Sequence, residues 1–126
     1  MGQAILEGFE KFAMKGRSFR PRLTIRTRGQ IGFNNGAVQR FDLGMYDYVV
    51  LYFSKEKNQI ALQLTNNKDE DGAVKLVKKT GNFFLSGKSF LDFYNIKYTE
   101  KALQYDIEMA GDNILLVNLK KEIKEK

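Results

Sequence analysis

The residue types that most often carry out catalysis are scarce in this sequence. It contains no histidine and no cysteine, which removes imidazole bases, thiolate nucleophiles and zinc sites built from these ligands. Paired carboxylates remain, and Asp106 and Glu108 would share one face of a strand. Neither lies in the apolar setting that activates a general acid. We therefore expect a binding protein rather than an enzyme.

Two segments resemble ligand-binding loops, and each lacks an essential residue. Residues 67–72 match the opening of a calcium loop, but the position that needs a bidentate glutamate is Lys78. Residues 87–89 read Gly-Lys-Ser, as at the end of a phosphate-binding loop, but the glycine required five positions earlier is Asn82. We expect no metal ion and no cofactor, and a solvated linker at residues 66–72.

Cations outnumber acids by 21 to 15, which gives a net charge of +6 and favours an acidic partner such as nucleic acid. The segment 15–28 holds six cations and no acid. Its arginines are candidates for phosphate contacts: Arg17, Arg20, Arg22, Arg26 and Arg28. Lys78 and Lys79 form a similar pair later in the chain. The alternative is that these are ordinary solvent-facing positions of half-buried strands.

The apolar pattern predicts two copies of a strand-strand-helix-strand-strand unit, at about residues 22–65 and 73–119. In the first copy, alternating strands flank a turn at residues 28–30, a short helix follows Asn34 or Asn35 and runs to Gly44, and a second hairpin spans residues 48–64. The two apolar faces would pack into one pseudo-two-fold small barrel with few open edges. The expected fold is mainly β with short helices, as a single barrel-like domain at residues 17–119.

The two ends of the chain lie outside these repeats. Residues 1–16 form a predicted amphipathic helix whose apolar face, Ile5, Phe9 and Phe12, is a candidate surface for a homo-oligomer. The charged tail, residues 120–126, is expected to fray or to form a turn of helix. No apolar stretch has the length of a membrane span and no signal peptide is evident, so we expect a cytoplasmic protein with no membrane partner.

The stretch from residue 29 to residue 47 resembles the AbrB/MazE/SpoVT family of swapped-hairpin barrels. The family signature is a glycine, two alternating apolar residues, a helix with spaced apolar positions, and an aspartate before the next strand. The matching residues are Gly29, Ile31, Phe33, Ala37, Phe41, Leu43 and Asp47. The second repeat fits more loosely. This chain has Gln30 and Asn34 where the family usually has arginine and proline.

Members of that family are mostly homodimers with interleaved hairpins, and many are transcriptional regulators or antitoxins that contact DNA through arginines of the first strands. The resemblance implies that two fused copies form an intramolecular version of such a dimer. By position it implies that the DNA-facing residues are Arg26, Arg28 and Arg40, with Lys78, Lys79 and Lys88 as their counterparts in the second repeat.

Three functions follow from these patterns. The leading one is a DNA-binding module of the transcriptional-regulator or antitoxin type. The second is a single-stranded nucleic-acid platform, because aromatic residues make up 13% of the chain and pairs such as Tyr52-Phe53 and Phe83-Phe84 place one ring on each face of a strand. The third is a non-catalytic assembly or adaptor domain.

Overall fold

A computed structural model describes residues 20–80 and 82–123. The predicted helix at residues 1–16, with Ile5, Phe9 and Phe12, and the candidate Arg17 lie outside these residues. The elements in chain order are β1 (Arg22–Ile25), β2 (Gln30–Phe33), α1 (Asn35–Arg40), the 3-10 helix η2 (Leu43–Met45), β3 (Tyr48–Ser54), β4 (Gln59–Thr65), β5 (Ala73–Lys75), β6 (Val77–Lys79), β7 (Asn82–Ser86), α2 (Lys88–Phe93), β8 (Leu103–Asp106), β9 (Glu108–Met109), β10 (Ile114–Asn118) and β11 (Glu122–Ile123). In the described part of the chain, no helix has the length and apolar character needed to cross a membrane.

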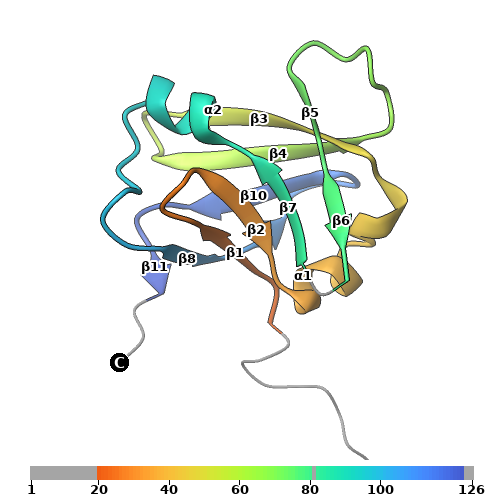
Figure 1. Cartoon of the computed structure of the whole chain (residues 1–126), viewed down its shortest axis with the longest axis horizontal. Coiled ribbons are helices and arrows are strands. Elements are labelled where there is room, and N and C mark those ends of the chain that lie inside the picture. The colour runs from red at the N-terminus through yellow and green to blue at the C-terminus, as the bar shows by residue number, and fades with distance from the viewer. Residues whose placement is uncertain (1–19, 81, 124–126) are drawn as a thin grey trace, which may run out of the picture.

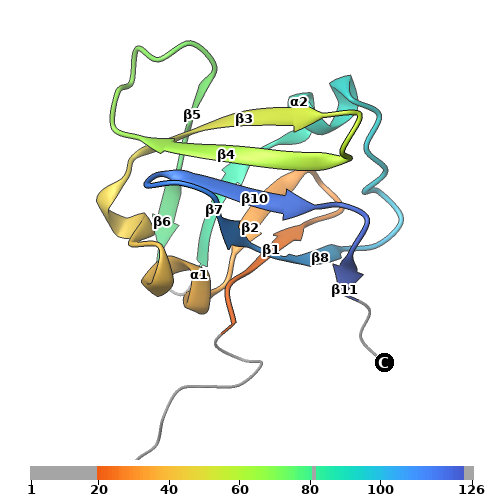
Figure 2. The same cartoon turned by 180° about the vertical axis from the view of Figure 1, so that it is seen from behind.

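The strands form two antiparallel sheets that face each other (Figures 1 and 2). One sheet has the order β11-β8-β1-β2-β7-β6, and the other has the order β5-β3-β4-β10-β9. The expectation of a mainly β fold with short helices is confirmed. The hydrogen-bonded ladders make two sheets rather than one continuous closed barrel, so the barrel stays a prediction.

The hairpins predicted from the alternating patterns are present. β1 pairs with β2 through a turn in which Gly29 has a φ of 93°, a conformation that glycine adopts without strain. β3 pairs with β4 over seven residues each, from Tyr48–Thr65 to Ser54–Gln59. The two halves of the chain then meet strand to strand, β2 against β7 and β4 against β10.

At two of the places where the chain passes from one sheet to the other, a single residue separates the two strands. Leu76 separates β5 from β6, and Ile107 separates β8 from β9, and the two strands on either side of each lie in different sheets. At these points the ladder is replaced by one backbone bond: Leu76 N–H donates to Asp47 C=O at 2.9 Å, and Ile107 N–H donates to Pro21 C=O at 3.3 Å. Both side chains are buried in the core. The expectation that Asp106 and Glu108 share one strand face is therefore wrong, because the chain changes sheet between them.

The core lies between the sheets and is built from the inward positions of both. Strand β4 shows the rule most clearly, since it alternates half-buried and buried residues along its whole length. No buried residue in the described segments is polar or charged. The fully buried side chains are Leu23, Ile25, Ile31, Leu43, Val49, Ile60, Leu62, Leu64, Leu85, Leu91, Leu115 and Val117.

The first helix ends before the predicted Gly44, and the second helix turns one of its aromatic residues to the surface. α1 ends at Arg40, because Asp42 takes a left-handed conformation with φ of 52°, and Leu43 belongs to the separate helix η2. In α2, Leu91 is the fully buried residue, whereas Phe93 is 76% exposed. Periodicity alone does not decide the end of so short a helix or which of its faces meets the core.

The expectation that the charged tail frays or forms a helical turn is wrong for its first residues. Glu122 and Ile123 form β11, which pairs antiparallel with Tyr105 and Gln104 of β8. β8 would otherwise be an open sheet edge, and its unpaired backbone groups provide the partners that the tail needs.

Asn34 fixes the geometry between α1 and the start of β1. Its side chain accepts from Ala37 N–H at 2.9 Å as the helix cap and from Arg22 N–H at 3.0 Å, and it donates to Arg20 C=O at 2.8 Å. We predict that Asn34→Ala lowers the free energy of unfolding by about 2 to 3 kcal/mol, since a cap and two further backbone bonds are lost. Urea unfolding measures this. Asn35→Ala, at the neighbouring exposed position, is the control and should change stability by less than about 0.5 kcal/mol.

Tyr105 makes stability depend on alkaline pH. Its side chain is buried, and this burial, with a smaller effect of the Glu122 carboxylate, raises the pKa of Tyr105 to about 12. The neutral phenol therefore stabilises the fold fully below about pH 10, the usual pKa of tyrosine, and this contribution is lost as pH rises from about 10 to 12. Between pH 9 and pH 11 we expect a loss of about 1 kcal/mol in the wild type that is missing in Tyr105→Phe, measured by urea unfolding. If the free energy of unfolding falls equally with pH in the two proteins, this prediction is wrong.

Candidate nucleic-acid interface

The outward surface of strands β1, β2, β7 and β6 carries cations and no acids. None of these four strands contains Asp or Glu. Cα partners lie on the same side of a sheet, so Thr24, Gly32, Phe84 and Val77 form one outward row across the four strands. We call this surface, together with Arg26, Arg28, Gln30, Lys79 and Asn82, the basic face.

Arg26 occupies the centre of the basic face. Its Nη1 donates to Gln30 Oε1 at 3.3 Å, and its Nη2 donates to Asn82 Oδ1 at 3.2 Å. The guanidinium lies against Gly32, where a Cβ atom would meet Nη2 at 2.5 Å and Cζ at 2.7 Å. These contacts hold the group in one place and leave the rest of its five donors available. A guanidinium ordered in this way loses little entropy when it binds a phosphate or a base edge.

An aromatic ring and a second cation lie beside Arg26. Phe84 is the β7 partner of Gly32, so its ring is on the same face as the Arg26 guanidinium. The ammonium of Lys79 lies 6.0 Å from the centre of the Phe84 ring, at the outer limit of a cation–π contact. Exposed Arg28 belongs to the turn at one end of β2. Cations beside a half-buried ring are the combination on which single-stranded bases stack.

Two of the predicted cations are paired with acids. Lys78 Nζ donates to Asp47 Oδ1 at 2.9 Å and to Gly44 C=O at 3.0 Å, which ties β6 to the segment before β3. Lys88 Nζ donates to Asp92 Oδ2 at 2.9 Å. The bond from Lys88, with one from Tyr98, lowers the pKa of Asp92, and the pKa of Lys88 is raised by the same bond to Asp92. The basic face therefore carries Lys79, and not Lys78, on the side of the second repeat.

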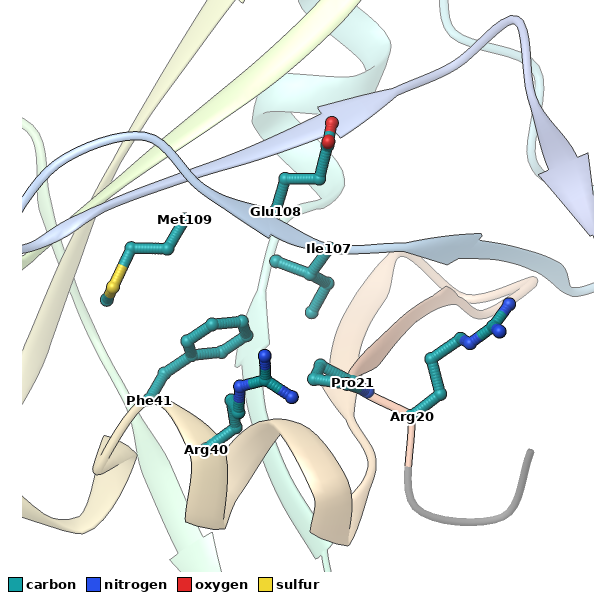
Figure 3. Close-up of a pocket in the computed structure, with 7 residues that line it drawn as sticks. All are labelled: Arg20, Pro21, Arg40, Phe41, Ile107, Glu108 and Met109. Carbon is teal, nitrogen blue, oxygen red and sulfur yellow. The ribbon is translucent and has the colours of Figure 1, made fainter. Parts of the chain in front are cut away.

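Of the remaining arginines, Arg22 lies in β1 on the same side of the sheet as Thr24, but its side chain is 15% exposed, whereas Arg20 and Arg40 lie outside the four strands. Arg20 and Arg22 both approach the Asp106 carboxylate, at 3.8 Å and 3.7 Å. Arg40 is exposed in the last turn of α1. Arg20 and Arg40 line one pocket, together with Pro21, Phe41, Ile107, Glu108 and Met109 (Figure 3). The structure thus places Arg26, Arg28 and Lys79 on the basic face and Arg20 and Arg40 at this pocket.

Sequence reasoning missed the residues that position Arg26. Gln30, Gly32 and Asn82 carry no charge and were not candidates, although a glycine inside a strand often marks a close approach by another group. Gly32 could have been singled out on that ground. Asn82 could not, because it lies 56 positions from Arg26 and meets it only through the β2–β7 pairing.

The segments that resembled ligand loops provide no metal centre in the described structure. Asn67 Oδ1 accepts from Asp69 N–H at 3.0 Å, so this oxygen closes a local turn. Within residues 20–80 and 82–123, no group of three or more acidic side chains is arranged to hold an ion.

Comparison with known proteins gives no relative from which a role could be transferred. The chain matches no protein-family model, and no curated protein or solved structure matches it significantly.

Gly32→Ala tests the placement of Arg26 without changing any charge. The added methyl group would overlap the Arg26 guanidinium, which is the mobile end of a side chain and can move. We predict that the variant folds, with a change in stability within about 1 kcal/mol, and that the Arg26 Nε–H resonance shifts as its bonds to Gln30 and Asn82 break. An Arg26 resonance that does not move would contradict this arrangement.

Proposed function

We propose that this protein binds nucleic acid through the basic face, with Arg26 at the centre of the contact. The observation that carries the proposal is the Arg26 guanidinium, held by Gln30 and Asn82 against Gly32 on a face whose strands contain no acid. A polyanion meets no like charge on these strands. Neutralised phosphates release counterions, which supplies affinity that does not depend on base sequence.

The arrangement of strands supports a regulator or antitoxin of the swapped-hairpin type as the class of protein. Hairpins β1–β2 and β6–β7 lie side by side through the β2–β7 pairing. In a family homodimer, two chains would supply such hairpins. The crossings at Leu76 and Ile107 join the two sheets, and with them the two repeats would form a pseudo-two-fold barrel. On this proposal Arg26 and Arg28 contact the phosphate backbone of a DNA duplex.

A single-stranded partner is the second candidate, and Phe84 is the observation that favours it. The ring lies on the basic face between Gly32 and Val77, its neighbours in the adjacent strands, and close to Lys79. A base could stack on this ring only if it were unpaired. Phe84→Leu would then weaken binding of single strands and leave binding of a duplex unchanged.

Binding of labelled duplex and single-stranded DNA across a salt series tests the proposal. We expect affinity to fall steeply with salt, and Arg26→Gln to weaken binding about tenfold and to reduce the slope of log affinity against log salt by about one. Gly32→Ala should weaken binding in the same direction, because it displaces the same group. Lys55→Gln removes one exposed positive charge from the turn between β3 and β4, in the other sheet, and is the matched control.

The control decides between a site and a general effect of charge. If Lys55→Gln weakens binding as much as Arg26→Gln, the net charge of +6 is responsible and the basic face is not the site. If neither strand form binds at low salt, the proposal is wrong.

A further inference from the structure

The Arg26 guanidinium turns one of its flat sides to Gly32. A Cβ atom on Gly32 would stand 2.5 Å from Nη2, 2.7 Å from Cζ and 2.8 Å from Nη1 of Arg26. A point almost equally distant from these three atoms at this range lies above or below the plane of the group, and not at its edge. Gly32 therefore faces the flat side of the guanidinium.

The neighbours of Gly32 place the guanidinium above it rather than beside it. Thr24 and Phe84 are the partners of Gly32 in the two adjacent strands, and their side chains flank it on the outward side of the sheet. The two bonds of Arg26 run to opposite sides of this row: Gln30 precedes it in β2, and Asn82 lies beyond it in β7. The group thus spans the row over Gly32, and its second flat side faces away from the sheet.

This outer flat side is open. Arg26 is half-buried, and Gln30, to which it is bonded, is exposed. Within the described part of the chain, the only cation over an aromatic ring is Lys79, so no ring covers the Arg26 guanidinium. Arg26 also forms no ion pair with an acid of residues 20–80 or 82–123. It presents a planar, charged and ordered surface to a partner.

Such a surface suits a nucleobase better than a phosphate. A guanidinium is planar, delocalised and weakly hydrated, and its flat side stacks on bases through the negative face of their rings. A phosphate instead accepts N–H groups in the plane of the guanidinium, and Arg26 already donates two of these to Gln30 and Asn82. Stacking needs none of these donors.

Phe84 provides a second flat group next to the first. Strands β2 and β7 lie side by side in the six-stranded sheet (Figure 1). Side chains of partner residues in antiparallel strands are about 5 Å apart, so Phe84 adjoins the position over Gly32 that the guanidinium fills. Two adjacent groups of this kind suit two neighbouring bases of one single-stranded nucleic acid.

We propose that the outer flat side of the Arg26 guanidinium stacks on an unpaired base of single-stranded DNA, beside a base on Phe84. This inference rests on the proposed function and names the contact that the basic face makes with a single strand. The bases of a duplex are paired and stacked on one another, so Arg26 would meet the phosphates there.

The test separates the flat side of Arg26 from its charge. Two short labelled DNA strands of equal length are titrated with the full chain at low salt: an oligodeoxyadenylate, and an abasic strand with the same phosphates and no bases. Arg26→Lys keeps the charge and removes the flat group. We expect this variant to bind the oligodeoxyadenylate about tenfold more weakly than the wild type does, and to bind the abasic strand within about twofold of the wild type.

Two further variants control for charge and for folding. Arg28→Lys makes the same exchange at an exposed position of the neighbouring turn and should change binding of either strand by less than about twofold. Gly32→Ala displaces the guanidinium without changing any charge, so it should weaken the oligodeoxyadenylate as Arg26→Lys does. Urea unfolding of each variant confirms that it is folded.

The proposal is overturned if Arg26→Lys binds both strands as the wild type does, or weakens both equally, because Arg26 would then act on phosphate. It is also overturned if Arg28→Lys weakens the oligodeoxyadenylate as much as Arg26→Lys does, or if the wild type binds the abasic strand as tightly as the oligodeoxyadenylate. In these cases the proposed function still stands if Arg26→Gln weakens DNA binding. If no DNA binds at low salt, the proposed function and this inference are both wrong.

Discussion

The two single-residue crossings between the sheets, at Leu76 and Ile107, are the constraint on which the rest of the structure depends. A strand that passes from one sheet to the other must leave its ladder, and its backbone N–H groups then need new partners. At Leu76 and Ile107 a single carbonyl, of Asp47 or Pro21, supplies that partner while the side chain enters the core. Both carbonyls belong to residues directly before a strand, so each crossing also fixes where β3 or β1 begins.

The same constraint shapes both the pocket and the basic face. Ile107 and its bond to Pro21 build one wall of the pocket, and Asn34 completes the frame by joining α1 to the start of β1. At the other crossing, β6 continues into the β6–β7 hairpin and brings Asn82 within reach of Arg26. The basic face therefore consists of residues from both halves of the chain, and neither half would form it alone.

The predicted cations differ in whether an acid or a neutral group binds them. Lys78 and Lys88 each meet an acid at 2.9 Å, Lys78 across elements at Asp47 and Lys88 within α2 at Asp92. Arg26 is held by neutral amide oxygens, which orient the guanidinium without neutralising it. This difference explains why a symmetric pair of clusters, Arg26 and Arg28 against Lys78 and Lys79, becomes an asymmetric face in the folded protein.

The sequence by itself determined the class of fold, the hairpins β1–β2 and β3–β4 and most of the core, because alternation with period two depends only on neighbouring residues in a strand. It also determined that the chain is basic and that residues 22–28 are rich in arginine. It could not determine that Leu76 and Ile107 interrupt their strands, because both fit the alternation, or that the tail would pair with the edge of β8. Only the tertiary structure decided which cations are bound to acids, that Gly32 makes room for Arg26, and that Arg20 and Arg40 line one pocket. Each of these depends on contacts between segments distant in sequence, and local patterns do not record such contacts.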